Sequence, residues 1–158
     1  IYQRHGANVR IATAADFEGN RWTVNAVTLQ TPRGVSYLMP VGSIARLFKK
    51  YNGKQGIAVA AAPSSLDIAA SSSGSRVYLH VASLEYSRTV RASFAVRGRT
   101  VKAGRVIAIA PEDLRQNVGL DQPGIFKPTE TALTPGPAPQ WTFPAGSVSV
   151  VELDLNTD

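Results

Sequence analysis

Carboxylates are the side chains in this sequence that are most able to do chemistry. In pairs they serve as the acid, base or nucleophile that hydrolyses glycosidic bonds. The candidates lie beside a predicted helix end, just after a predicted strand, and in a proline-rich stretch (Asp16 and Glu18; Glu112 and Asp113; Asp121 and Glu130). Each also fits a helix cap or a solvated loop charge, and that is the role we expect. The sequence therefore predicts no complete catalytic pair.

Other catalytic or metal-binding chemistry has little support. The chain has no cysteine and only two histidines, of which His5 is near the start and His80 falls within a predicted strand. A lone strand histidine usually has a structural role, and without a second nearby ligand no transition-metal site is expected. No Ser/His/Asp order, P-loop or dinucleotide glycine motif is present. We expect neither a metal nor a cofactor.

Two kinds of binding surface are alternatives to catalysis. Four aromatic residues could form a platform for sugars, although aromatic residues in sheets more often pack in the core: Tyr78, Tyr86, Trp141 and Phe143. Six basic residues could bind nucleic acid: Arg88, Arg91, Arg97, Arg99, Lys102 and Arg105. The net charge of +6 is spread along the chain without a block of like charges, which favours a solvated basic surface. We expect no nucleic-acid partner.

Length and composition limit the class of protein. With 158 residues, of which 44% are hydrophobic, the chain can form one packed domain, or one domain plus part of another. No apolar run approaches the roughly 20 residues that span a bilayer. Because the first residue is Ile1, we expect the sequence to begin inside a longer protein or after processing. Bacterial secreted, periplasmic and cytoplasmic locations would all fit.

Residues 1–54 combine helical and strand patterns. Residues 9–17 weakly indicate a helix face that stops at Gly19-Asn20, and residues 22–29 form a β-branched run that predicts a buried strand. Residues 31–34 are typical of a turn.

A second helix in this region has the clearest pattern of the chain. Its apolar stripe follows helical spacing: Ile44, Leu47, Phe48 and Tyr51. We expect Gly42 or Ser43 to cap its start and Asn52-Gly53 to end it in a left-handed conformation. A strand and an amphipathic helix cannot bury their own faces, so we expect residues 1–54 to pack against a partner.

Residues 55–158 read as a mainly β domain, an antiparallel β-sandwich. Short alternating runs separated by turn residues predict strands at 57–61, 66–70, 77–81, 90–96 and 106–110. Turns are expected at residues 71–75 and 97–99, and a long proline-rich irregular stretch at residues 111–140. In the last strand, apolar residues change face between Val150 and Val151, which predicts a β-bulge there.

An ordered set of motifs covers most of the chain. Residues 77–83 read VYLHVAS, residues 110–130 contain APEDLRQN, DQP and FKPTE, and residues 143–153 read FPAGSVSVVEL. Earlier, residues 24–27 read VNAV, and residues 39–51 run from Met-Pro to Leu-Phe-Lys-Lys-Tyr. In this order and spacing they resemble the last barrel strand and helix and the closing sandwich strands of retaining clan A glycoside hydrolases of the α-L-arabinofuranosidase type.

The resemblance implies a definite architecture and activity. Residues 1–54 would complete a (β/α) barrel, and residues 55–158 would form a jelly-roll-like accessory sandwich. The family cleaves arabinofuranosyl linkages with retention, using two glutamates on earlier barrel strands, so neither catalytic residue maps to this chain. We expect the partner to be an upstream barrel, as a segment or a separate chain, and the substrate to be a glycan.

Three residues of this chain are expected near the sugar: Asn25, Tyr37 and Met39. Met39 stands where the family brings a polar Gln or Thr toward the substrate, so β-xylosidase-like and glucuronidase-like specificities stay open. Two readings outside this class also stay open: a non-catalytic carbohydrate-binding or adhesion module, and a basic nucleic-acid-binding domain.

Overall fold

The computed structural model describes residues 2–13, 17–20, 25–29 and 34–156. This part of the chain is mainly β, with antiparallel sheets and no closed barrel. One 3-10 helix and one α-helix accompany the strands: η1 (Tyr2–His5), β1 (Glu18–Gly19), β2 (Val27–Thr28), β3 (Tyr37–Leu38), α1 (Pro40–Lys50), β4 (Gln55–Ile57), β5 (Leu66–Ser73), β6 (Arg76–Ser83), β7 (Val90–Ser93), β8 (Val101–Ile109), β9 (Thr129–Leu133), β10 (Gln140–Phe143) and β11 (Val148–Leu155).

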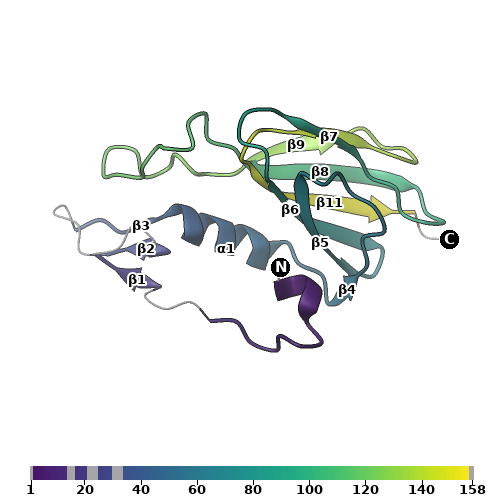
Figure 1. Ribbon diagram of the computed structural model, residues 1–158, viewed down its shortest axis with the longest axis horizontal. Coiled ribbons are helices and arrows are strands. Elements are labelled where there is room, and N and C mark those ends of the chain that lie inside the picture. Colours follow the sequence, from purple (N-terminus) through teal and green to yellow (C-terminus); the bar gives the residue numbers. More distant parts are fainter. Residues whose placement is uncertain (1, 14–16, 21–24, 30–33, 157–158) are drawn as a thin grey trace.

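A six-stranded antiparallel sheet forms the centre of the molecule (Figure 1), in the order β4-β5-β6-β11-β8-β9. The last strand of the chain, β11, lies between β6 and β8. Its residues alternate strictly between two buried faces: Val150 belongs to the core on one face, and Val151 and Leu153 to the core on the other. The β-bulge predicted at Val150 is therefore wrong, because both faces are covered and no change of register is needed; the irregularity lies between Asp154 and Leu155.

One face of this sheet is covered by the two-stranded antiparallel sheet of β7 and β10. The register pairs Phe143 with Val90 and Trp141 with Ala92. Phe143 is 1% exposed and makes an edge-to-face contact with Phe94, with ring centroids 6.2 Å apart. The predicted alternation in residues 90–96 is confirmed here, because the odd-numbered Arg91 and Ser93 are exposed while Val90 and Phe94 are buried.

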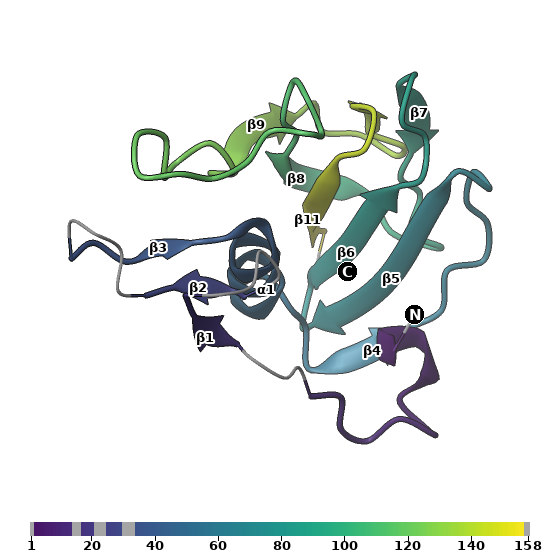
Figure 2. The same cartoon turned by 60° about the vertical axis from the view of Figure 1, so that its left-hand side comes forward.

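The opposite face is covered by α1 and by the loop between β8 and β9 (Figure 2). Leu47 and Tyr51 of α1 pack with Ile107 and Val150 of the sheet, and Phe126 of the loop joins the same core. The predicted apolar stripe is confirmed, but its partner is this chain's own sheet, not another polypeptide. The helix starts one turn earlier than expected: Met39 is its N-cap and Pro40 occupies the first turn, where a missing N–H is tolerated.

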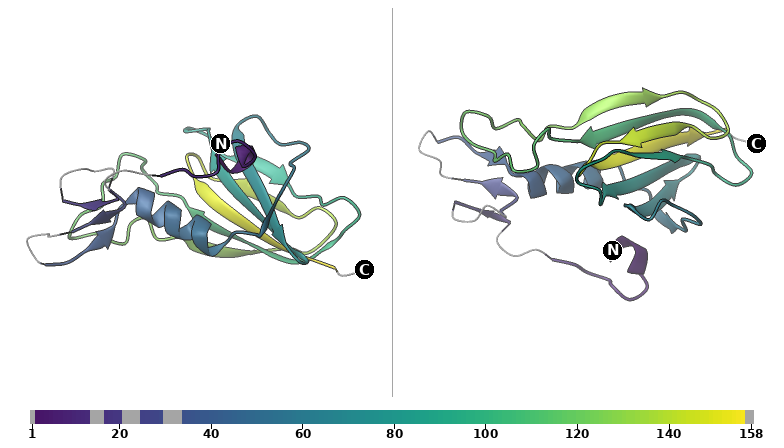
Figure 3. Two further views of the ribbon diagram at one scale, coloured as in Figure 1. Left: turned by 90° about the horizontal axis from the view of Figure 1, so that it is seen from below. Right: turned by 45° about the horizontal axis from the view of Figure 1, so that its top comes forward.

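A small three-stranded sheet extends from the N-terminal end of α1 (Figure 3). Strand β2 pairs in parallel with β1 and antiparallel with β3, with two residue pairs in each ladder. Gly42 of α1 approaches it so closely that an added Cβ would overlap the Ala26 carbonyl. The helix and this small sheet therefore pack backbone to backbone, which only glycine permits at position 42.

Several predicted boundaries differ from the structure. Residues 9–13 and Phe17 are not helical, and residues 14–16 and 22–24 lie outside the described residues, so the predicted strand at 22–29 is seen only as β2. Gly53 does not adopt a left-handed conformation. Glycine is required at position 53 because an added Cβ would overlap the Ser72 backbone. Residues 71–73 belong to β5, and the turn is made by Gly74 with φ of 61°.

The long irregular stretch also contains a strand. The prolines flank β9 at Pro128 and Pro135 and leave Thr129–Leu133 free to pair with β8 at the sheet edge. By contrast, the alternating run at residues 57–61 is not an inward-facing strand. Only Gln55–Ile57 pairs with β5, and residues 58–62 are exposed.

Candidate functional site

The three residues expected near a sugar lie close together at the junction of β2, β3 and α1. Tyr37 pairs with Thr28, Leu38 pairs with Val27, and the Met39 N–H donates to the Ala26 carbonyl at 2.9 Å. This antiparallel ladder places Met39 opposite Ala26, next to Asn25. The structure therefore brings the predicted set together around β2 and β3, with Tyr37 in β3, Met39 just after β3 and Asn25 shortly before β2.

The burial of these residues limits what they can contact in this chain. Asn25 is 1% exposed, and its carboxamide lies beside Gly19, where an added Cβ would be 3.1 Å from Oδ1. Met39 is buried in the core under α1, and Tyr37 is half-buried against the same core. Asn25 and Met39 thus act as packing residues here, and only Tyr37 keeps part of its surface open. Whether they approach a sugar stays a prediction.

The candidate carboxylates do not form a catalytic pair among the described residues. Glu18 is in β1, Glu112, Asp113 and Asp121 are in the exposed loop after β8, and Glu130 is in β9. Asp113 accepts hydrogen bonds from the backbone N–H and the side chain of Arg115, which is the loop-capping role expected for it. Asp16 lies outside the described residues.

Two glutamates do meet at one arginine. Arg105 of β8 bonds Glu130 of β9 at 2.8 Å and the nearly buried Glu152 of β11 at 2.9 Å, and its guanidinium lies 5.5 Å from the ring centroid of Tyr51. The hydrogen bond to Glu130 and the negative charge of Glu152 raise the pKa of Arg105 above its ordinary value. Both carboxylates are compensated by this cation, so the cluster joins three strands and has no free acid or base.

His80 is a structural residue, as predicted. It is 5% exposed, its ring stacks on Phe48 with centroids 4.1 Å apart, and its Nε2 lies 2.6 Å from the Tyr51 carbonyl. Burial lowers its pKa below the ordinary 6.5, despite the opposing hydrogen bond to Tyr51. A neutral ring with the proton on Nε2 donates to Tyr51 and accepts from the Gln3 amide at Nδ1, 2.8 Å away. The ring therefore ties η1 to the end of α1.

The aromatic platform is not assembled. Phe143 and Trp141 face the core under β7 and β10, whereas Tyr78 packs against the core under α1, on the opposite face of the large sheet. Tyr86 is 73% exposed in the loop after β6. These four residues thus share no surface on which a sugar ring could stack.

The basic residues considered for nucleic acid are mostly engaged within the chain. Arg88 pairs with Glu85, Arg91 with Gln140, and Arg99 donates to the Asn156 carbonyl at 2.8 Å. Together with the Arg105 cluster, these bonds engage four of the six basic residues within the chain. The described residues contain no group of three or more His, Asp or Glu side chains able to hold a metal ion. Within the same residues, no helix has the length and apolar character needed to cross a membrane.

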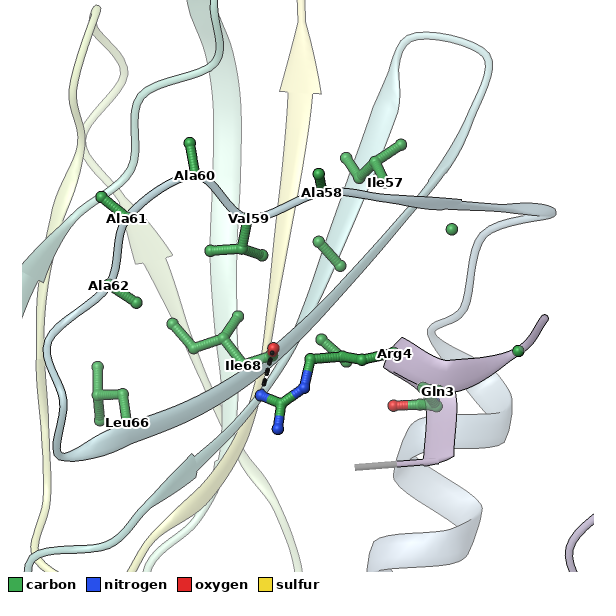
Figure 4. Close-up of a pocket in the computed structure, with 14 residues that line it drawn as sticks. Gln3, Arg4, Ile57, Ala58, Val59, Ala60, Ala61, Ala62, Leu66 and Ile68 are labelled. Atoms are coloured by element: carbon green, nitrogen blue, oxygen red, sulfur yellow. Dashed lines mark hydrogen bonds between the residues drawn. The ribbon is translucent and has the colours of Figure 1, made fainter. Parts of the chain in front are cut away.

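The structure adds one feature that the sequence reading missed. A groove of about 640 Å³ lies between residues 57–62 and β5 (Figure 4), and Gln3 and Arg4 of η1 border it. Most of the residues that line it are small and apolar, Gln3 and Arg4 add polar groups, and none of them is a carboxylate or a histidine. A signal was present in the sequence: residues 58–62 are almost all alanine, and such short side chains fill a core poorly.

Comparisons with known proteins support the fold. No protein-family model matches the chain, and no curated protein matches it. A GH51 arabinofuranosidase from Xanthomonas axonopodis pv. citri shares the fold with a TM-score of 0.77 and 17% identity, covering 97% of this chain and 33% of its own. The MgGH51 α-L-arabinofuranosidase matches with a TM-score of 0.74 and 17% identity, covering 86% of this chain and 22% of its own. A thermostable GH51 α-L-arabinofuranosidase from Thermotoga petrophila matches with a TM-score of 0.69 and 21% identity, covering 82% of this chain and 31% of its own.

These likenesses confirm the resemblance predicted from the sequence motifs: this chain has the fold of part of the GH51 α-L-arabinofuranosidases. It spans a third or less of the length of each of those structures.

Proposed function

We propose that this chain is the C-terminal part of a glycoside hydrolase similar to α-L-arabinofuranosidases. The observation that carries the proposal is the coverage: the fold likeness extends over 82–97% of this chain but only 22–33% of the GH51 structures. In this proposal residues 55–158 form a jelly-roll-like sandwich that braces the enzyme. Residues 1–54 supply the last strand and helix of a catalytic (β/α) barrel.

The chemistry of the described residues supports a division of labour. Retaining glycosidases need two carboxyl groups about 5 to 5.5 Å apart. Among the residues that the structure describes, Glu130 and Glu152 meet at one cation, and both are bonded to Arg105. The acid/base and the nucleophile are therefore supplied by the upstream polypeptide, and this chain alone is inactive.

The junction of β2, β3 and α1 is the part of this chain that lies nearest the substrate in the proposed enzyme. Asn25 and Met39 hold the backbone there, and the partly exposed Tyr37 is the side chain free to line a sugar subsite. With a thioether at position 39, that side chain offers no strong hydrogen bond to a hydroxyl group. An arabinofuranoside is the proposed substrate, and a xyloside or glucuronide is the competing one.

Activity of the native protein tests this proposal. The polypeptide or complex that contains these residues is captured from its source with an antibody against this chain, and its intact mass is measured. It is then assayed with 4-nitrophenyl α-L-arabinofuranoside, β-D-xyloside and β-D-glucuronide.

We expect a mass about three times that of this chain or more, with hydrolysis of the arabinofuranoside, and no turnover by the isolated 158 residues. A native protein that consists of this chain alone, or that cleaves none of the three substrates, would contradict the proposal. Turnover by the isolated chain that Glu112→Gln removes would contradict it too.

A further inference from the structure

One dipeptide of this chain can undergo a covalent modification that the proposed function does not involve. Asn52-Gly53 follows α1 and leads into β4 at the edge of the large sheet (Figure 2). Of the asparagines in the sequence, Asn52 alone precedes a glycine. An asparagine in that position deamidates most readily, because glycine has no side chain to hinder its backbone nitrogen and the backbone there rotates freely.

The modification proceeds in two steps. The backbone nitrogen of Gly53 attacks Cγ of Asn52, its proton passes to the departing amide group, and ammonia leaves as a succinimide ring closes. Water then opens the ring at either carbonyl and gives aspartate or isoaspartate. The first step requires the Gly53 nitrogen to lose its proton and to move into bonding contact with Cγ. A contact that holds both groups in place therefore slows the reaction.

Packing imposes this reactive sequence on the chain. A side chain at position 53 would overlap the Ser72 backbone of β5, so only glycine allows the segment after α1 to approach the sheet. The dipeptide is also open to water. Asn52 is exposed, and a cavity of about 170 Å³ borders both Asn52 and Gly53. Burial therefore does not protect the carboxamide of Asn52.

Ser71 of β5 contacts both reacting groups. Its Oγ accepts a hydrogen bond from the Gly53 N–H, with the two atoms 2.9 Å apart, and donates to Asn52 Oδ1 at 3.1 Å. A hydroxyl group donates one proton and accepts with its oxygen, so both bonds form at the same time. The first bond keeps the proton on the Gly53 nitrogen, and the second holds the carboxamide by its oxygen.

We propose that the Ser71 hydroxyl protects Asn52-Gly53 against deamidation in the folded chain. Isoaspartate at position 52 would add a methylene group to the backbone beside the close contact of Gly53 with Ser72, directly after the Tyr51 carbonyl that bonds His80. Either product also places a negative charge at the C-terminal end of α1, where the helix dipole disfavours it. Protection by Ser71 thus preserves the joint between α1 and the large sheet.

Peptide mapping by mass spectrometry tests the proposal. The 158-residue chain is incubated at mildly alkaline pH and cleaved with trypsin, and the mass added when a carboxyl group replaces the amide is followed in residues 51–54. Ser71→Ala removes both hydrogen bonds, so we expect deamidation at Asn52 to become at least about tenfold faster. The matched control is Ser73→Ala, which removes a hydroxyl from the same face of β5 and should change the rate by less than about twofold.

A second measurement needs no variant. The original chain should deamidate at Asn52 at least about tenfold more slowly when folded than in urea above its unfolding midpoint, because Ser71 lies beside the dipeptide only in the folded state. In urea the original chain and both variants should react at the same rate. Circular dichroism shows which of the proteins are folded before each incubation.

Three results would overturn the inference. An unchanged rate in folded Ser71→Ala, or equal rates for the original chain with and without urea, would show that the hydroxyl gives no protection. A slower reaction in Ser71→Ala would show that the hydroxyl relays the proton from Gly53 to the amide group instead. An equal acceleration in Ser73→Ala would mean that loss of either hydroxyl merely loosens β5.

Discussion

The large sheet and the small sheet are built from similar residues but are stabilised very differently. Strand β11 pairs with β6 through seven residue pairs and with β8 through eight, whereas each ladder of the small sheet has two pairs. Val81, Val150 and Val151 of the large sheet are fully buried, while Phe17, next to β1, is 48% exposed and Ile11 is 82% exposed. The large sheet buries most of its apolar side chains, with Ile57 at its edge 39% exposed, whereas the β2 and β3 residues of the small sheet are only half-buried.

This difference shows which region of the chain covers its apolar surface with its own residues. Apolar surface in water costs about 25 cal/mol per Å², so a region that leaves it open gains stability when another surface covers it. The helix α1 belongs to the region that covers its own apolar surface, because it packs on the large sheet. The small sheet beyond α1 does not belong to that region.

The largest expected effect comes from the core between the sheets. Phe143→Ala removes a ring that is 1% exposed and should lower the free energy of unfolding by about 3–5 kcal/mol. The matched control is Phe17→Ala in the isolated chain, which should change it by less than about 0.5 kcal/mol. Urea unfolding followed by circular dichroism measures both, and equal losses would abolish the contrast between the two regions.

A second substitution asks to which region α1 belongs. Leu47→Ala should cost about 2–5 kcal/mol, because Leu47 is buried against the large sheet. Val41→Ala on the exposed side of the same helix should stay within about 0.5 kcal/mol. If Leu47→Ala were as mild as Val41→Ala, the helix would not be docked on the sheet in solution.

A third prediction concerns the joint between α1 and the large sheet. Gly53→Ala introduces a methyl group that overlaps the Ser72 backbone, and we expect a loss of about 1–3 kcal/mol. Gly56→Ala is the control three residues later, since an added Cβ there has no neighbour within 4 Å. Thermal unfolding of the two variants compares them, and a Gly53→Ala variant as stable as Gly56→Ala would show that the close approach is absent.

The smallest effect is expected from pH. The pKa of buried His80 is lowered in the folded state, so the unfolded chain binds the proton more readily as the pH falls below 6.5. Its contribution to stability is therefore complete above pH 6.5 and is lost progressively toward the lower folded pKa.

His80→Gln should flatten the stability profile between pH 7.5 and 5 relative to the original chain. Denaturant titrations at several pH values measure this, and parallel profiles for the two proteins would show that His80 does not titrate differently on unfolding.

The sequence predicted strands and the helix best where apolar residues repeat at regular spacing over several positions. The runs around Val77 to Val81 and Val90 to Phe94 were recognised as strands because their alternation reflects a buried face. The helix was recognised because the stripe from Ile44 to Tyr51 matches its packing on the sheet. Because β11 is covered on both faces, its apolar residues ran together, and the predicted β-bulge was a misreading of this two-sided burial.

The rest depended on contacts that are distant in sequence. Gly53 was interpreted as a helix stop, yet glycine is required there by the close approach of Ser72. Strand β9 was not predicted, because prolines lie just outside both of its ends. For the candidate site, Asn25, Tyr37 and Met39 lie close together in the structure, and their approach to a sugar stays a prediction. The sequence could not show that Asn25 and Met39 are buried. Met39 belongs to a core that includes Val118 and Phe126 of the loop after β8, which is distant in the sequence.

The most direct test of the account is hydrogen exchange in the two sheets, compared between the isolated chain and the native polypeptide that contains it. We predict slow exchange in β6, β8 and β11 in both forms. Residues 17–20, 25–29 and 34–38 should exchange fast in the isolated chain and slowly in the native protein, where the catalytic barrel covers the small sheet. Equal protection of both sheets in the isolated chain would contradict the account, because the small sheet would then be a complete layer of a single self-contained domain.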